Sequence, residues 1–264
     1  MLSETRLFLL DMDGTLYLGD EVIPGAREFI HTLEQTGRQY IYLTNNSSRA
    51  GRDYVERLRG LDFPCKPENV FTSGMATALY LKEAYPGKGV YLVGTEAFRR
   101  ELLAEGIRIT DEAPSAVVVG FDTELTYAKL ERAVHFLRCG ADFIAANPDW
   151  VCPLPKGEVL PDCGSICALL TAASGIEPRY IGKPNRNMID IISKATGVPN
   201  TQIACVGDRL YTDIAVAKNA GAISICVLSG ETDEAALAAS ALRPDYIFPS
   251  VREFGKMLNS LHNV

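Results

Sequence analysis

Short apolar runs alternate with longer segments of helical period along most of the chain. The first run, Leu7 to Leu10, has no polar position, as expected of a strand that is buried on both faces of a sheet. Strand and helix patterns in alternation are typical of an α/β fold, in which helices cover a mostly parallel sheet. The pattern predicts strands over residues 7–10, 40–43, 90–93, 116–120, 142–146, 202–206, 222–227 and 246–248.

Helical periods fill most of the intervals between these runs, and several begin at a residue that can cap a helix. A short extended segment, NVF at residues 69–71, leads to a cap at Thr72 or Ser73 and then to a further helix. The stretch 147–161 carries four prolines, which favour a loop or a hairpin over regular helix. The other predicted helices are residues 25–35, 49–59, 96–105, 126–139, 165–174, 187–196 and 211–220.

The rhythm of strands and helices is interrupted once. The sequence PGKG at residues 86–89 is typical of a boundary, and the first rhythm resumes beyond Gly182. We therefore expect a Rossmann-like core made of residues 1–85 and 180–264. A smaller α/β domain, residues 86–179, is inserted in it.

Composition excludes several classes of protein. The chain has 26 basic and 33 acidic residues, so no general positive field attracts nucleic acid. No apolar stretch approaches the ~20 residues of a membrane helix, which predicts no membrane partner and a cytoplasmic location. The seven cysteines include no C-x-x-C pair and the three histidines form no zinc pattern, so reduced thiols are expected.

Polar residues stand where several predicted strands end. Asp11 and Asp13 follow the first strand, residues 44–46 (Thr-Asn-Asn) follow the second, and Asp208 follows the strand IACVG. Lys183 comes directly after the short extended segment RYIG. Ligands of open α/β sheets bind at the carboxyl ends of the strands, so these groups are expected to meet there.

Three acids at one sheet edge repel each other unless a cation lies among them. Mg²⁺ prefers oxygen ligands and usually keeps room for a phosphate oxygen, so the sequence predicts a Mg²⁺ site and a phosphate ester as substrate. Asp11 is the predicted nucleophile, which forms an aspartyl-phosphate. Asp13 is the predicted general acid and base, and Lys183 and Thr44 are expected to bind the phosphoryl oxygens.

Four motifs in this order resemble those of the haloacid dehalogenase (HAD) superfamily. They are DMDGT at residues 11–15, YLTNNS at 42–47, GKP at 182–184 and VGDRLYTDI at 206–214. The large insert, with GTLYLGDEVIPGA, TNNSSR and AANPD, is similar to that of the NagD-like, 4-nitrophenylphosphatase branch with its type C2 cap. The resemblance implies Mg²⁺-dependent hydrolysis of small phosphomonoesters.

By motif position, the resemblance implies that the metal is held by Asp11, by the backbone carbonyl of Asp13 and by Asp208. Asp213 matches a second acidic position and is expected to act from outside the direct ligands. The sequence departs from several relatives in the cap, where it reads LPDCGSIC with Asp162 ahead of Gly164. The motifs do not name the substrate, because fold and motif fix only the chemistry at phosphorus.

Four further residues are candidate substrate contacts. Asn45 and Asn46 are expected to touch phosphate, either with their side chains or with their backbone amides alone. Asn147 and Asp149, in the cap sequence NPDW, are candidates for contact with the leaving group, although Asn-Pro-Asp is also an ordinary turn.

Two other functions remain open at this point. A receiver-like signalling module also combines acids, Mg²⁺, Thr and Lys, but the insert and the second acid at plus two argue against it. A phosphomutase or other phosphotransferase would use the same aspartyl-phosphate, and the sequence does not exclude one. The predicted partner is a small phosphorylated metabolite, and a homo-oligomer formed through the cap is possible.

Overall fold

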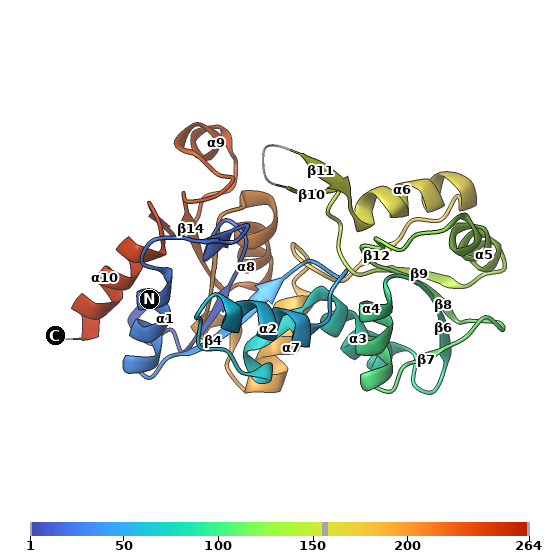
Figure 1. Cartoon of the computed structure of the whole chain (residues 1–264), viewed down its shortest axis with the longest axis horizontal. Coiled ribbons are helices and arrows are strands. Elements are labelled where there is room, and N and C mark those ends of the chain that lie inside the picture. Colours follow the sequence, from blue (N-terminus) through green and yellow to red (C-terminus); the bar gives the residue numbers. More distant parts are fainter. Residues whose placement is uncertain (1, 155–157, 263–264) are drawn as a thin grey trace. The chain divides into compact units, whose positions relative to one another are not determined.

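The computed structural model describes residues 2–154 and 158–262. Contacts within the chain divide it into two compact units, which are shown in Figure 1. Unit 1 consists of Met1–Thr44, Tyr54–Phe71 and Lys183–Val264, and unit 2 of Asn45–Asp53 and Thr72–Gly182. The chain therefore passes from one unit to the other four times.

Unit 1 is built on a six-stranded sheet with the strand order β15-β14-β13-β1-β4-β5. Strand β1 is central and runs parallel to both of its neighbours, so that Leu7 pairs with Ile203 on one side and with Gln39 on the other. The strands are β1 (Leu7–Leu10), β4 (Gln39–Thr44), β5 (Val70–Thr72), β13 (Ile203–Gly207), β14 (Ile223–Val227) and β15 (Tyr246–Phe248).

Helices pack against this sheet because its strands are apolar on both faces. Phe8 and Leu10 point into a core formed with α1 (Ala26–Gln35), α2 (Gly51–Gly60) and α10 (Val251–His262). Leu7 and Leu9 point to the opposite face and are also buried, as expected from the alternation of side chains along a strand. Helices α7 (Asn187–Thr196) and α8 (Ala215–Ala220) pack against each other, and α8 contacts β13 and β14.

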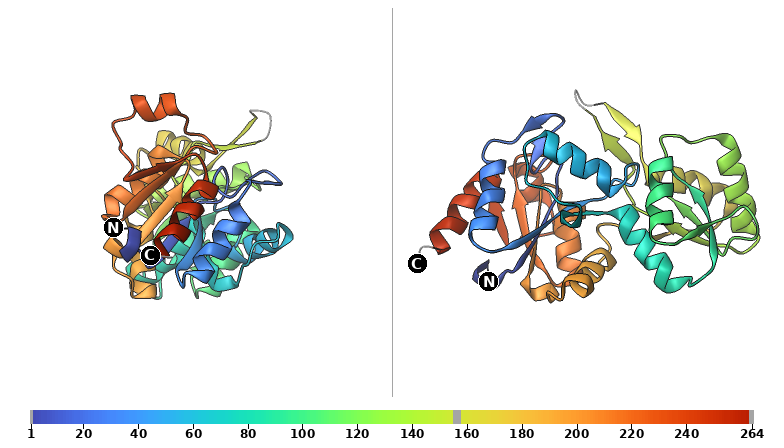
Figure 2. Two further views of the ribbon diagram at one scale, coloured as in Figure 1. Left: turned by 90° about the vertical axis from the view of Figure 1, so that its left-hand side faces the viewer. Right: turned by 60° about the horizontal axis from the view of Figure 1, so that its bottom comes forward.

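The last helix of the chain joins the core next to the first one. Figure 2 shows α10 beside α1, and their contact contains the ring of Phe254. Its centroid lies 5.9 Å from that of Phe8, 5.3 Å from that of Phe29 and 5.0 Å from that of Phe248. Such tilted aromatic pairs add to the stabilisation that comes from burial of the rings.

Unit 2 has its own five-stranded sheet, with the order β12-β9-β8-β6-β7 and parallel pairing throughout. Helices α5 and α6 form a core with β6, β8 and β9, and α3 packs against α4. The strands are β6 (Gly89–Val93), β7 (Arg108–Ile109), β8 (Ala116–Val119), β9 (Asp142–Ala145) and β12 (Arg179–Tyr180). The helices are α3 (Ser73–Ala84), α4 (Glu96–Ala104), α5 (Tyr127–Arg138) and α6 (Cys163–Ser174).

Most predicted elements are present within a few residues of their expected ends, and the α/β fold class is confirmed. The proline-rich stretch forms an antiparallel hairpin of β10 (Val151–Pro153) and β11 (Val159–Pro161), while residues 155–157 of that stretch lie outside the described residues. The elements that the sequence did not predict are the β2 (Tyr17–Leu18) and β3 (Glu21–Val22) hairpin, β7, α9 (Glu234–Ala239), α10 and the short helical turns Leu2–Glu4, Pro67–Asn69 and Asn200–Gln202.

The predicted domain boundaries at 85/86 and 179/180 differ from the divisions between the units. Helix α3 was expected in the core but belongs to unit 2, because it packs against α4. The segment Asn45–Asp53 also belongs to unit 2 by its contacts. Compact units need not be independently folding domains, so the three-segment scheme stays a prediction.

The helices found in residues 2–154 and 158–262 include none with the length and apolar character that a bilayer crossing requires.

Candidate active site

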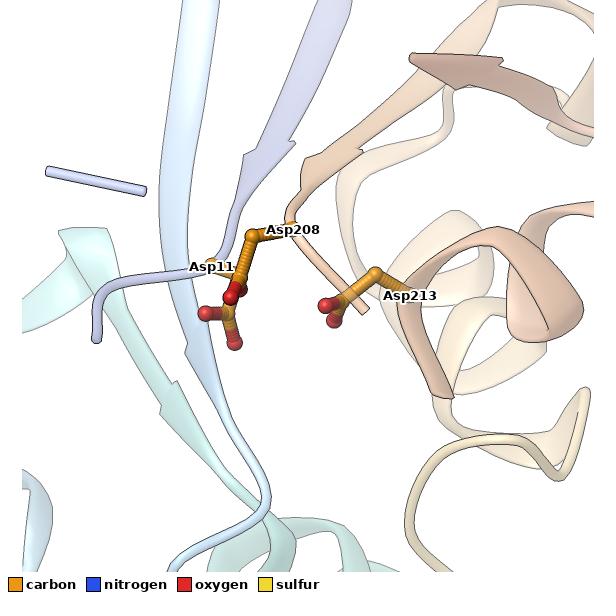
Figure 3. A group of neighbouring side chains, drawn as sticks. All are labelled: Asp11, Asp208 and Asp213. Atoms are coloured by element: carbon orange, nitrogen blue, oxygen red, sulfur yellow. The ribbon is translucent and has the colours of Figure 1, made fainter. Parts of the chain in front are cut away.

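Three carboxylates meet at the carboxyl edge of the unit 1 sheet. Asp11 follows β1 and Asp208 follows β13, and these two strands are neighbours. Asp213 lies in a π-helical turn, Leu210–Ile214, that precedes α8. One ligand oxygen from each acid lies within 4.8 Å of the others, as Figure 3 illustrates. The structure therefore brings together acids that are far apart in the sequence.

Lys183 supplies a positive charge to the same group. Its side chain is only 3% exposed. Its Nζ donates to Oδ1 of Asp11 and to Oδ1 of Asp213, and both N–O distances are 2.6 Å. Burial disfavours the ammonium ion, but the two carboxylates outweigh this cost and raise the pKa of Lys183 above its ordinary value. The lysine is therefore held as a cation next to the predicted nucleophile.

The carboxyl groups of Asp11 and Asp208 are harder to ionise in the folded protein than in water. Burial first, and then the charge of Asp213, raises the pKa of Asp11 well above its ordinary value, although Lys183 acts in the opposite direction. Burial and Asp213 also raise the pKa of Asp208 to about 6. A further cation among these oxygens would favour the ionised form of both acids.

The three acids fit a divalent cation of the Mg²⁺ type. All the offered ligand atoms are carboxylate oxygens, which Mg²⁺ prefers to nitrogen or sulfur. Both oxygens of Asp213 already accept hydrogen bonds, one from Lys183 and one from the backbone N–H of Arg209 at 3.1 Å. Asp208 also accepts on both oxygens, from the backbone N–H of Glu231 at 2.7 Å and from the Thr15 hydroxyl at 3.5 Å, so hydrogen bonding alone does not rank Asp208 above Asp213 as a ligand.

Two glycines make room for Asp208. A Cβ at Gly14, where φ is +84°, would lie 2.3 Å from Oδ2 of Asp208, and one at Gly230 would lie 2.0 Å from the same atom. That oxygen accepts the backbone N–H of Glu231 at 2.7 Å. The bare backbone on both sides therefore fixes the carboxylate against the loops after β1 and β14.

Asp13 lies on the loop between β1 and β2 and forms an isolated bridge with Tyr17. Its side chain is exposed, and its carboxylate is not part of the close group of oxygens found among the described residues. Its roles as general acid and base, and as a carbonyl ligand of the metal, stay predictions.

The Thr44 motif spans the division between the units. Thr44 is the last residue of β4 and is buried in unit 1. Asn45 and Asn46 belong to unit 2. Oδ1 of Asn46 accepts from the backbone N–H of Ser48 at 2.9 Å and from its hydroxyl at 2.7 Å. The Asn46 side chain thus closes a local turn, and its predicted contact with phosphate is untested.

Asn147 and Asp149 both belong to unit 2, where they lie beyond the carboxyl end of β9. Asn147 is fully buried, and its Nδ2 donates to Asp149 at 2.9 Å and to Asp162 at 3.0 Å. Asp149 also accepts from Nδ2 of Asn45 at 2.7 Å. Contact of Asn147 and Asp149 with a leaving group stays a prediction.

Two groups near the acids were not predicted from the sequence. Arg209 pairs with Glu231 at 3.1 Å. Burial lowers the pKa of Arg209, but the charges of Asp11 and Asp208 outweigh this effect, so its pKa lies above the ordinary value. The loop after β14 supplies the N–H of Glu231 to Asp208. Ligands of open α/β sheets bind beyond the carboxyl ends of the strands, so the residues after the predicted strand at 222–227 pointed to this loop.

The chain matches known families along most of its length. Residues 8–108 match the family described as haloacid dehalogenase-like hydrolase, and residues 180–254 match one described as HAD-hydrolase-like. The acid sugar phosphatase of Staphylococcus aureus (strain USA300) is 35% identical over 253 residues, which are 96% of this chain and 97% of that protein.

Solved structures of similar proteins agree with this match. The 4-nitrophenylphosphatase of Thermotoga maritima has a TM-score of 0.93 at 42% identity, covering 97% of this chain and 98% of its own. NagD from Escherichia coli K-12 has a TM-score of 0.88 at 34% identity, covering 94% and 98%. The chain therefore belongs to the haloacid dehalogenase-like hydrolase family, in its NagD-like, 4-nitrophenylphosphatase branch.

Proposed function

We propose that the protein is a Mg²⁺-dependent phosphatase that hydrolyses small phosphomonoesters through an aspartyl-phosphate. The observation that carries the proposal is the close group of Asp11, Asp208 and Asp213 with Lys183 bonded across it. The names of the relatives, an acid sugar phosphatase and a 4-nitrophenylphosphatase, support hydrolysis of a phosphate ester.

In the first half-reaction, a carboxylate oxygen of Asp11 attacks phosphorus while the bond from phosphorus to the ester oxygen breaks. Asp13 donates its proton to the departing oxygen, so the leaving group departs as a neutral alcohol. Lys183 keeps its positive charge beside Asp11 and offsets the charge of the phosphoryl oxygens.

In the second half-reaction, Asp13 is ionised and takes a proton from water. The water oxygen bonds to phosphorus, the bond to Asp11 breaks, and phosphate and the free carboxylate are released. Asp11 and Asp208 are the residues that would hold Mg²⁺, and the Asp13 carbonyl is the further expected ligand. When bound, Mg²⁺ supplies positive charge that favours the ionised acids and the binding of a phosphate group.

A colorimetric assay tests this function. Purified protein with Mg²⁺ is expected to release 4-nitrophenol and free phosphate in equal amounts from 4-nitrophenyl phosphate. EDTA should abolish the release, and added Mg²⁺ should restore it. Phosphate that appears on an added alcohol or sugar instead of in solution would point to a phosphotransferase. A protein that is phosphorylated once and does not turn over would point to a receiver-like module.

The substrate class and the setting are part of the proposal. Nucleotides, sugar phosphates and similar small metabolites all present the same phosphoryl group, so a panel of phosphomonoesters compared by kcat/KM is the direct way to find the natural one. The seven free thiols, five of them buried, suit the reducing cytoplasm. Assembly through the cap remains a prediction for which oligomeric state in solution is the test.

A further inference from the structure

Two of the chain's passages between the units directly adjoin predicted phosphate-binding residues. Thr44 is the last residue of its unit 1 segment, and Asn45 begins the next segment in unit 2. Gly182 is the last residue of unit 2, and Lys183 begins the following segment of unit 1. The contacts that Asn45 and Gly182 make within unit 2 therefore involve the residues covalently bonded to Thr44 and to Lys183.

Two residues of unit 2 hold Asn45: the Ser73 hydroxyl donates to its backbone carbonyl at 2.5 Å, and Asp149 holds its side chain. One oxygen of Asp149, Oδ2, accepts from Nδ2 of Asn45 at 2.7 Å and from Nδ2 of Asn147 at 2.9 Å. Asn147 is itself fixed, because its Oδ1 accepts from the Ser47 hydroxyl at 2.9 Å and its amide nitrogen also donates to Asp162. Hydrogen bonds to a carboxylate are stronger than bonds between neutral groups.

The turn that carries Asp149 packs against the first turn of α6. The backbone N–H of Gly164 donates to the carbonyl of Asp149 at 2.8 Å, and a Cβ at Gly164 would lie 2.4 Å from the carbonyl oxygen of Pro148. The side chain of Asp162 caps the start of α6 and binds Asn147. The unusual sequence around Asp162 and Gly164 thus fixes the Asn-Pro-Asp turn.

Gly182 packs against Ala146 and Asn45. Its N–H donates to the carbonyl of Ala146 at 2.8 Å, and a Cβ there would lie 2.6 Å from that carbonyl oxygen and 2.6 Å from Oδ1 of Asn45. The passages after Thr44 and before Lys183 are therefore packed together beside the Asp149 turn.

We propose that Asp149 is a positioning residue for phosphate binding. By holding the Asn45 side chain, and together with the Ser73 bond to the Asn45 carbonyl, it fixes the backbone of residues 45 and 46 in the conformation in which their N–H groups donate to a phosphoryl group. This inference rests on the proposed function. It differs from the sequence-based prediction for Asp149, which was contact with the leaving group.

Inorganic phosphate is the probe that separates these two roles, because it has no leaving group. Its Kd is measured by calorimetry on the full protein with Mg²⁺, for the wild type and for Asp149→Ala, Asn45→Ala and the double variant. Each single change is expected to raise the Kd about tenfold, as for loss of one hydrogen bond to a charged group. The phosphate Kd of the double variant should be no higher than that of the single variant that binds phosphate less tightly, because both substitutions remove the same contact.

Conservative and control variants complete the design. Asp149→Asn keeps the shape and one acceptor oxygen, so it should recover part of the affinity. Asp142→Asn changes an exposed acid at the other end of β9, bonded to Tyr85, and should bind phosphate like the wild type. In turnover, Asp149→Ala should lower kcat/KM by the same factor for 4-nitrophenyl phosphate and for an alkyl phosphate.

An unchanged phosphate Kd in Asp149→Ala and Asn45→Ala would overturn the proposal. If the turnover loss then differed between the two esters, Asp149 would be a leaving-group contact instead. The proposed function fails separately if the wild type hydrolyses no ester although it binds phosphate, since the Kd comparison needs no turnover. A wild type that hydrolyses esters but binds no phosphate would overturn the positioning role alone.

Discussion

The two sheets of this protein share one architecture but differ at their carboxyl edges. Both have helices packed on parallel strands, and both gather polar side chains where the strands end. In unit 1 the edge holds Asp11, Asp208 and Asp213, and the buried Lys183 bonds to the first and the last of these acids. In unit 2 the edge holds Asn147 and Asp149. Asn147 donates to the carboxylates of Asp149 and Asp162 and accepts from the Ser47 hydroxyl, and Asp149 also accepts from the amide of Asn45.

The difference lies in what each edge still needs. Burial and the neighbouring acids raise the pKa of Asp11 and of Asp208, and a cation bound among these oxygens would favour their ionised forms. The buried amide of Asn147 already has partners for both its oxygen and its nitrogen. Carboxylates therefore face one another at the unit 1 edge, whereas Asn147 and Asp149 at the unit 2 edge are joined to each other by a hydrogen bond.

The most severe test of this comparison is Asp11→Asn, which removes the proposed nucleophile from the unit 1 edge. We expect turnover of 4-nitrophenyl phosphate to fall by at least about 10⁴-fold, because an amide cannot form the aspartyl-phosphate. Asp20→Asn, which changes an exposed side chain of the same N-terminal segment, should keep its activity. Near wild-type turnover in Asp11→Asn would mean that another nucleophile exists.

Asp13→Asn should have the next largest effect, and one that depends on the leaving group. We expect a loss of about 10²- to 10⁴-fold for an alkyl phosphate and a smaller loss of the first step for 4-nitrophenyl phosphate, which needs little protonation. Single-turnover release of the alcohol measures this step alone. Equal losses for the two esters would contradict the general-acid role.

Phe254→Ala tests how much the aromatic core beside the unit 1 sheet contributes to the free energy of unfolding. The ring is fully buried among Phe8, Phe29 and Phe248, so its loss should lower the free energy of unfolding by about 3 to 5 kcal/mol. Urea unfolding measures the change. Tyr127→Ala, at a side chain in unit 2 that is 82% exposed, should stay within about 0.5 kcal/mol of the wild type.

Unit 2 also contains one acid whose pKa is raised, and it sharpens the comparison. Burial raises the pKa of Glu101 to about 7, although the N–H of Gly51 and the hydroxyl of Thr72 donate to it and lower the pKa. Between pH 4.5 and 7 the unfolded chain loses this proton while the folded chain keeps it, so stability falls as pH rises.

Glu101→Gln removes this titration. The stability of the variant relative to the wild type should therefore increase from pH 4.5 to pH 7, by up to about 3 kcal/mol. Urea unfolding at both pH values measures the difference, with Glu131→Gln, an exposed change on α5, as the control. A difference that does not vary with pH would show that Glu101 ionises in the folded protein as in the unfolded chain.

The sequence predicted the elements that have a simple pattern. Strands such as β1 and β13 are uninterrupted apolar runs, and the polar residues after them led directly to Asp11 and Asp208. Helix α10 was missed although Val251, Phe254 and Leu258 have helical spacing, because Gly255 in its middle lowers the helix propensity. The two-residue strand β7 is too short to show alternation at all.

Details that depend on long-range packing could not be predicted. The π-helical turn that carries Asp213 was expected as an ordinary helix, since periodicity does not distinguish one wide turn. The bond between Asn45 and Asp149 joins residues separated by 104 positions, and nothing in either motif specifies it. For the same reason the sequence identified Asp149 as a candidate but not its partner.

The repeated passage of the chain between the units limits how this protein can be re-engineered. A graft of residues 72–182 alone, intended to transfer the substrate preference of one relative to another, would leave behind Ser47 and Gly51, which bond to Asn147 and Glu101. A working chimera has to exchange the short segment 45–53 together with the long one.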